Sequence, residues 1–144
     1  MTEKKLLNRS DYKKFYSMAS RWRDNDVYGH INNVTYYSYF DSAVNQYLIE
    51  NSNLDILKSD VVGYVVHSNC NYLSPISYPE LIDTGIIVIK IGNSSVTYGI
   101  GIFKSGETKV SAYGEFVHVF VNRSEKKPVP IPEKILKPLK QILI

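Results

Sequence analysis

The stretch RWRDNDVYGHINNVTYYSYFDSA, residues 21–43, decides the fold of this chain, because a polar turn gives way within it to an aromatic helix. Asp24 and Asp26 precede Gly29, which permits a sharp reversal of the backbone. Asn32 and Asn33 follow, and an Asn side-chain oxygen can accept a free N–H of a first helical turn. The stretch therefore predicts a turn that ends at a helix N-terminus.

The predicted helix runs from Val34 to about Glu50. Its apolar residues recur at helical spacing, and neither Pro nor Gly interrupts them. These residues are Val34, Tyr37, Phe40, Val44, Tyr47 and Leu48.

Strands are predicted on both sides of this helix, because apolar and polar residues alternate there with period two. The predicted strands are 13–23, 61–74, 81–91, 95–104 and 108–121. The last four can pair as an antiparallel meander with the helix against the sheet, which is an α+β arrangement. Residues 86–89 are apolar on both faces, so we expect a second subunit to cover this part of the sheet.

The 144 residues predict one domain, 1–144, in which 1–12 and 123–144 are expected to be peripheral. The tail has helical spacing, but Pro138 is expected to break or kink a helix there. The single cysteine, Cys70, excludes an internal disulfide and favours a reducing compartment, so we expect the cytoplasm. No apolar run is long enough to span a membrane, and a net charge of +3 does not call for a nucleic-acid partner.

The turn offers two chemical tools side by side. A nearby carboxylate, Asp24 or Asp26, can act as base or nucleophile, and the N–H groups at the start of the helix can polarise a carbonyl. This combination suits transfer of an acyl group to water. Taken alone, however, the residue types favour an ordinary solvated turn and helix cap.

A resemblance to a known family favours the catalytic interpretation of this turn over the ordinary turn and helix cap. The string at residues 21–43 resembles the signature of the 4-hydroxybenzoyl-CoA thioesterase family, and IGNSSVTYGIGIF, VSAYGEFVHVFVN and KKPVPIPEK resemble its later segments, so the likeness covers about 16–134. It implies the hotdog fold, a long helix wrapped by a curved antiparallel sheet of about five strands. It also implies hydrolysis of an acyl-CoA thioester to free acid and CoA, without a cofactor.

The resemblance also implies roles for residues of the turn. Asp26 matches the catalytic carboxylate, as base or nucleophile, and the N–H at or next to Asn33 would polarise the thioester carbonyl. His30 matches a recurrent histidine that orients water or a neighbouring side chain. Gly29 and Asn32 would contact the substrate.

Coenzyme A carries phosphates, so basic and polar residues are expected at the mouth of the site. The candidates are Ser95, in the turn that also holds Asn93 and Ser94, and the basic residues Arg123, Lys126 and Lys127. Solvated loop residues explain these positions equally well. A homodimer or homotetramer is expected.

Two other functions remain open: hydrolysis of acyl carrier protein thioesters, and a non-catalytic hotdog module that binds acyl groups. The Asp-x-Asp before Gly-His-x-Asn-Asn fits hydrolysis better than the hotdog dehydratases. Cys70 is expected to be a small buried residue, and His30, His67 and His118 lack the spacing of a metal site, so no metal is expected. A few tyrosines, among them Tyr28 or Tyr64, are candidates for an acyl tunnel.

Overall fold

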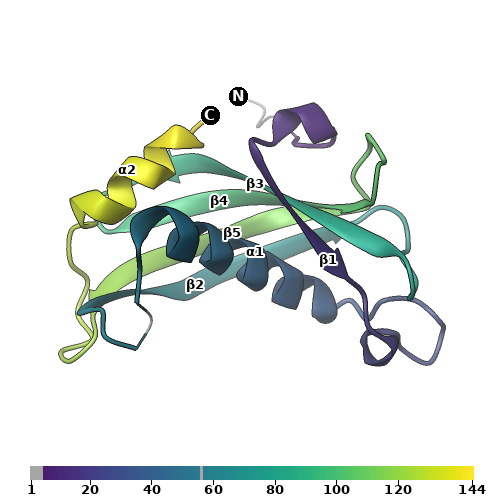
Figure 1. The fold of residues 1–144 in the computed structure, drawn as a ribbon, viewed down its shortest axis with the longest axis horizontal. Coiled ribbons are helices and arrows are strands. Elements are labelled where there is room, and N and C mark those ends of the chain that lie inside the picture. Colours follow the sequence, from purple (N-terminus) through teal and green to yellow (C-terminus); the bar gives the residue numbers. More distant parts are fainter. Residues whose placement is uncertain (1–4, 56) are drawn as a thin grey trace.

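The computed structural model describes residues 5–55 and 57–144 and contains one sheet, one long helix and one short helix (Figure 1). The strands are β1 (Lys14–Ala19), β2 (Val61–Tyr72), β3 (Leu81–Ile91), β4 (Ser95–Lys104) and β5 (Ala112–Asn122). The helices are α1 (Thr35–Ser52) and α2 (Glu133–Gln141), with 3-10 turns at Arg9–Asp11 and Trp22–Asp24.

All five strands form one antiparallel sheet in the order β1-β3-β4-β5-β2, curved around α1 (Figure 1). The predicted meander is correct for β3, β4 and β5, but the expected place of β2 beside β3 is wrong. The link 73–80 holds two prolines and buries Ile76 completely, and the carbonyl of Ile76 accepts the N–H of Ile31 at 2.7 Å. The link is thus tied to the turn before α1 and does not close a β2–β3 hairpin.

Three predicted strands differ from the structure at one end by two residues or more. β1 ends at Ala19 instead of 23, because the next residues form a 3-10 turn in which the Asp24 carboxylate accepts the Arg21 N–H at 2.8 Å. β2 ends at Tyr72 instead of 74. β5 begins at Ala112 instead of 108, because Val110 donates its N–H to Leu7, outside the sheet.

The main core lies between α1 and the concave face of the sheet. Phe40, Ala43 and Val44 of α1 have no exposed surface, and they pack against inward side chains of the strands such as Ile100 and Phe116. Burying large apolar side chains in this way is the chief stabilising contribution to a fold of this size.

A second cluster covers the other face of β3 and β4. Leu6 and Tyr12, from the segment before β1, pack with Ile87, Phe103 and Val110. The expectation that a second subunit covers residues 86–89 is therefore wrong, because the N-terminal segment of the same chain covers them.

Both segments expected to be peripheral contribute to the core, apart from residues 1–4, which lie outside the described residues. Leu6 and Tyr12 are buried in the second cluster, and Ile135 and Leu139 of α2 are completely buried. The helix α2 continues through Pro138, and the hydroxyl of Tyr47 on α1 donates to the Pro138 carbonyl at 2.6 Å. Packing on α1 thus holds a helix that the proline was expected to break or kink.

Candidate active site

The turn between β1 and α1 is held by its own backbone. Asp26 donates its N–H to the His30 carbonyl at 2.8 Å, and Gly29 donates to the Asp26 carbonyl at 3.1 Å. Gly29 has φ of 84°, in the left-handed region that glycine adopts without strain. Asn25 and Ile31 form an isolated β-bridge across the base of the turn. The turn is therefore a preformed, rigid element.

Asp24 holds this turn against the helix. Its buried carboxylate accepts a hydrogen bond from the Tyr39 hydroxyl at 2.8 Å and forms an ion pair with Arg21 at 3.1 Å. Burial raises the pKa of Asp24, but the hydrogen bonds from Arg21 and Tyr39 outweigh it and hold the pKa below its usual value. Asp24 therefore has a structural role.

Asp26 is half-buried, and its carboxylate is only partly used by the turn. Its Oδ1 accepts the Tyr28 N–H at 2.8 Å and makes a long 3.5 Å contact with the His30 N–H. Among the described residues, nothing donates to its Oδ2. One carboxylate oxygen is thus available for a substrate or a water molecule.

The helix α1 begins at Thr35, slightly later than predicted. The Asn32 side chain accepts the Val34 N–H at 3.0 Å, and the Asn32 carbonyl accepts the Thr35 N–H at 2.9 Å. The N–H of Asn33, between these two, makes no hydrogen bond within 5–55 and 57–144. It is a donor at the positive end of a helix, where it can stabilise developing negative charge on a carbonyl oxygen.

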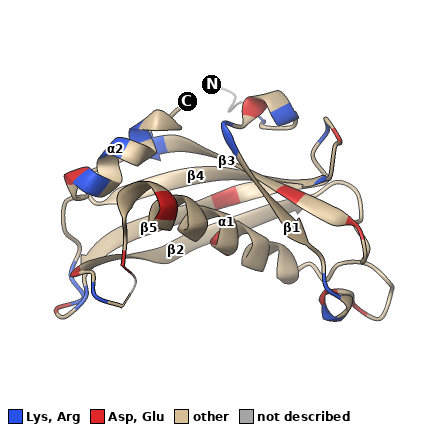
Figure 2. Cartoon of the chain, in the orientation of Figure 1, with Lys and Arg blue, Asp and Glu red and all other residues tan. Residues whose placement is uncertain are grey.

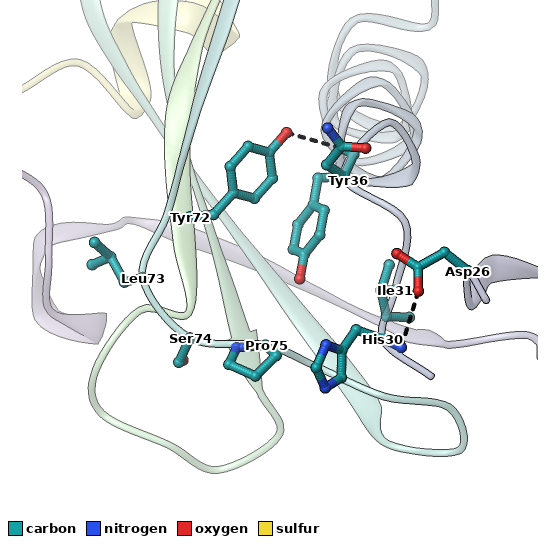
Figure 3. A pocket seen from close by; sticks show the side chains of 9 residues that line it. Asp26, His30, Ile31, Tyr36, Tyr72, Leu73, Ser74 and Pro75 are labelled. Atoms are coloured by element: carbon teal, nitrogen blue, oxygen red, sulfur yellow. Dashed lines mark hydrogen bonds between the residues drawn. The ribbon is translucent and has the colours of Figure 1, made fainter. Parts of the chain in front are cut away.

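Asp26 and Asn33 line the same cavity, which has a volume of about 330 Å³ (Figure 3). This volume lies at the lower end of the usual range for small-molecule sites, roughly 300–1,000 Å³. The other lining residues are His30, Ile31, Tyr36, Tyr72, Leu73, Ser74 and Pro75. We call it the inner cavity.

Two tyrosines of the inner cavity were not singled out from the sequence. Tyr72, the last residue of β2, donates its hydroxyl to the Asn33 carbonyl at 2.8 Å, and its ring lies 5.1 Å from that of Tyr36 (Figure 3). No local signal identifies this pair, because the two residues are 36 positions apart and meet only through the sheet. Tyr28 and Tyr64, the tyrosines named as candidates, do not line the inner cavity.

His30 and Gly29 have different positions around Asp26. The His30 side chain is exposed, lines the inner cavity and makes no hydrogen bond with the described part of the chain. Gly29 lies on the outer side of the turn, where it lines a second hollow that also includes Asp26. Asn32 contributes through its bond to Val34 and lines neither hollow.

Residues expected to bind phosphates lie at the other end of the sheet. Ser95 begins β4, and Arg123 follows β5, where its N–H donates to Asp60 just before β2. Lys126 and Lys127 lie in the next turn, which Figure 1 shows at the opposite end of the sheet from the turn before α1 that holds Asp26. The single chain does not bring these residues together with Asp26.

The remaining candidates have structural surroundings. Cys70 is half-buried, and burial raises the pKa of its thiol to about 11, so it is a poor nucleophile at neutral pH. In residues 5–55 and 57–144, no group of three His, Cys, Asp or Glu side chains is placed to hold a metal ion. No helix in these ranges is both long and apolar enough to cross a bilayer.

A long helix inside a curved five-stranded antiparallel sheet, with a carboxylate beside the helix N-terminus, defines the class as a hotdog-fold, thioesterase-like domain. The sequence model of the thioesterase-like superfamily matches residues 20–139. The chain therefore belongs to the thioesterase-like superfamily.

Solved structures support this placement. The PA5185 protein of Pseudomonas aeruginosa PAO1 is 46% identical with a TM-score of 0.93, over 94% of this chain and 95% of that chain. The PA2801 protein of the same species is 25% identical with a TM-score of 0.77, over 85% and 95% of the two chains. Slr0204, a 1,4-dihydroxy-2-naphthoyl-CoA thioesterase from Synechocystis, shares the fold at 14% identity and a TM-score of 0.80, over 89% and 96%. No curated protein sequence matches the chain.

Proposed function

We propose that the protein hydrolyses acyl-CoA thioesters to a free acid and CoA. One observation carries the proposal: Asp26 and Asn33 line the same cavity, and among the described residues nothing donates to Oδ2 of Asp26 and nothing accepts the N–H of Asn33. An acyl-transfer site needs a base or nucleophile on one side of a carbonyl and a hydrogen-bond donor at its oxygen. Membership of the thioesterase-like superfamily supports the same chemistry.

In the proposed reaction, the thioester carbonyl oxygen accepts the Asn33 N–H. If Asp26 acts as a base, it takes a proton from water, and the water oxygen attacks the carbonyl carbon. The C–S bond then breaks, and the proton passes from Asp26 to the leaving thiolate. If Asp26 attacks the carbon itself, CoA leaves as the thiolate, and water then hydrolyses the acyl-aspartyl anhydride. His30, which lines the inner cavity, would orient the water.

We also propose that the protein forms a homodimer. The observation that supports this is the edge of β2, which is the last strand of the sheet. This strand is 12 residues long and has no Lys, Arg, Asp, Glu or Pro, so it is entirely tan in Figure 2. It exposes Tyr64, Val65 and Val66 beside its unpaired backbone groups. Such an edge pairs readily with another strand, and a second copy of β2 supplies one of equal length.

Antiparallel pairing of two β2 strands would also bring the residues that are expected to bind the CoA phosphates closer to an inner cavity. Each β2 runs from Val61, beside Arg123, to Tyr72 in the inner cavity. The partner's turn with Arg123, Lys126 and Lys127 would then lie near the inner cavity of the first subunit. The Ser95 of the second copy would come nearer to this inner cavity in the same way. An assembly of two such dimers gives the homotetramer.

The decisive experiment follows thiol release from short, medium, long and aromatic acyl-CoAs by the wild type and two variants. Asp26→Asn keeps the shape of the side chain but removes the base or anionic nucleophile, so we expect hydrolysis to be abolished with folding intact. Asn33→Ala keeps the backbone N–H, so we expect most of the turnover to remain. Circular dichroism checks the fold of both variants.

Other outcomes would change the proposal. Retention of most of the turnover by Asp26→Asn removes Asp26 from the mechanism. Thiol release only from acyl carrier protein thioesters favours the carrier substrate, for which surface lysines would steer an acidic partner. No thiol release from any thioester favours a non-catalytic acyl-binding module.

A further inference from the structure

A second hollow opens on the outer side of the turn. It has a volume of about 600 Å³ and is lined by Trp22, Arg23, Asn25, Asp26, Val27 and Gly29. We call it the outer hollow. It shares Asp26 with the inner cavity, so the residue that carries the candidate catalytic carboxylate lines both spaces. A thioester has two arms that leave the reacting carbonyl in different directions, and two hollows lined by the same residue offer a separate place for each arm.

The walls of the outer hollow are unusually apolar for an exposed turn. The Trp22 side chain is 75% exposed and Val27 is 93% exposed. The Trp22 ring makes a T-shaped contact with Tyr78, with ring centroids 6.0 Å apart at an interplanar angle of 73°. Exposed tryptophan is costly in water and is enriched where proteins bind partners or ligands.

Polar groups of the outer hollow are also open to a ligand. Arg23 is exposed and makes no ion pair with the described part of the chain. The side-chain oxygen of Asn25 accepts the Tyr78 N–H at 3.1 Å, so its NH₂ group is left to donate. The neighbouring Arg21 differs, because its guanidinium is paired with Asp24 at 3.1 Å. Arg23 is therefore the cation that the turn presents to an anion.

The outer hollow is preformed. Its backbone is held by the Asp26–His30 hydrogen bond, by the Gly29–Asp26 hydrogen bond and by the Asn25–Ile31 bridge. A surface that is ordered before binding loses little conformational entropy when a ligand arrives. The exposed side chains thus form a ready site.

We propose that the outer hollow binds the phosphopantetheine arm of the substrate, which leaves the inner cavity to the acyl group. The apolar carbons of the arm would pack on Trp22 and Val27, its amide carbonyls would accept from Asn25, and its phosphate would pair with Arg23. Coenzyme A and acyl carrier proteins share this arm. The proposal rests on the proposed thioesterase function and names the part of its site that holds the leaving group.

Trp22 allows a direct binding test, because it is the only tryptophan of the chain. Free CoA is titrated into the wild type while tryptophan fluorescence is followed, with N-acetylcysteamine, which lacks the phosphate end, as the parallel ligand. We expect a saturable change with CoA and none with N-acetylcysteamine. This measurement does not need turnover, so the phosphopantetheine site can be judged even if no thioester is hydrolysed.

Kinetics provide the second test. Losing a charge-assisted hydrogen bond weakens binding by about tenfold. The quantity to compare is the ratio of kcat/KM for a CoA thioester to kcat/KM for the N-acetylcysteamine thioester of the same acyl group. We expect Arg23→Gln to lower this ratio about tenfold. Trp22→Ala should lower the same ratio. A thioester of an acyl carrier protein, tested in parallel, shows whether the enzyme takes the phosphopantetheine arm from CoA or from a carrier protein. Lys58→Gln and Leu57→Ala, exposed residues beyond the other end of α1, are the controls and should leave the ratio unchanged.

Three results would overturn the assignment. An unchanged ratio in Arg23→Gln and Trp22→Ala would show that the arm does not contact the outer hollow. A fall in the ratio in Lys127→Gln, with none in Arg23→Gln, would place the phosphate at the other turn instead. A CoA titration that leaves Trp22 fluorescence unchanged while isothermal calorimetry records binding would contradict it as well.

Discussion

At the scale of single residues, two aspartates separated by one residue have different surroundings. Asp24 is buried, and Arg21 and Tyr39 hold its carboxylate in place. Asp26 is half-buried and lines the inner cavity, and nothing among the described residues donates to one of its oxygens. The resemblance to the thioesterase family singled out Asp26, but only burial and hydrogen bonding show why its surroundings differ from those of Asp24.

Tyr72 is a residue whose role depends on the folded structure. Its hydroxyl donates to the Asn33 carbonyl at 2.8 Å and so orients the backbone beside the proposed oxyanion donor. We predict that Tyr72→Phe lowers kcat about fivefold, the effect of losing one neutral hydrogen bond of roughly 1 kcal/mol. Steady-state kinetics with an acyl-CoA that the wild type hydrolyses will measure this.

A comparison of two variants separates the positioning role of the Tyr72 hydroxyl from the packing of its ring. Tyr72→Phe keeps the ring contact with Tyr36, whereas Tyr72→Ala removes it as well. If Tyr72→Phe is as active as the wild type and only Tyr72→Ala loses activity, the hydroxyl has no positioning role and the ring alone matters.

At the scale of elements, the segment before β1 packs on glycines of the sheet. A Cβ at Gly101 would lie 2.6 Å from Cζ of Tyr12, and a Cβ at Gly85 would lie 3.0 Å from Cγ of the same residue. The Tyr12 ring therefore lies where side chains would otherwise project. This explains how the segment can cover β3 and β4 closely enough to exclude water.

We predict that Gly101→Ala lowers the free energy of unfolding by about 1 to 3 kcal/mol, because the added methyl group displaces Tyr12 from its contact. Denaturant unfolding will measure the change. The double variant Gly101→Ala/Tyr12→Ala should be less destabilised than the sum of the two single variants. Strict additivity would show that the methyl group and the ring do not meet.

The free edge of β2 yields a prediction about assembly at the scale of the whole molecule. Val66 is 59% exposed on this edge. A lysine on a strand edge opposes pairing with another strand, so we predict that Val66→Lys converts a dimer into a monomer. Light scattering coupled to size exclusion will show the mass, and Leu57→Lys, far from β2, is the control. A monomeric wild type would refute dimerisation through β2.

The stability of the whole molecule should also depend on pH, because a histidine is buried in its core. The ring of His118 is almost fully buried beside Tyr98, at a centroid distance of 5.2 Å, and neither ring nitrogen has a hydrogen-bond partner within the described residues. Burial lowers the pKa of His118 from 6.5 to about 4. Between these values the unfolded chain binds a proton that the folded chain does not.

The folded state should therefore lose stability as pH falls from 6.5 to 4, by about 3 kcal/mol in total. Denaturant unfolding across this range will measure it, and His118→Leu should remove most of the slope. Asp24 and Asp83, whose pKa values are lowered by hydrogen bonds that outweigh burial, add their own loss only at still lower pH. An equal slope in His118→Leu would assign the effect to other groups.

The sequence by itself determined the features that depend on neighbours along the chain. The period of the apolar residues placed the long helix and the five strands, and the turn chemistry of residues 24–33 indicated a helix N-terminus close to Asp24 and Asp26. The resemblance of the motif then raised this turn from an ordinary cap to a candidate site. These features could be predicted because hydrogen bonds within a turn and the period of a helix are local.

Only the tertiary structure decided which distant segments meet. It placed β2 beside β5, covered β3 with the N-terminal segment, brought Tyr72 to Asn33 and separated Arg123 and the lysines from Asp26 within one chain. Strand order and side-chain encounters depend on how the whole core is packed, and many pairings bury similar amounts of apolar surface. No residue pattern within a short window carries that information.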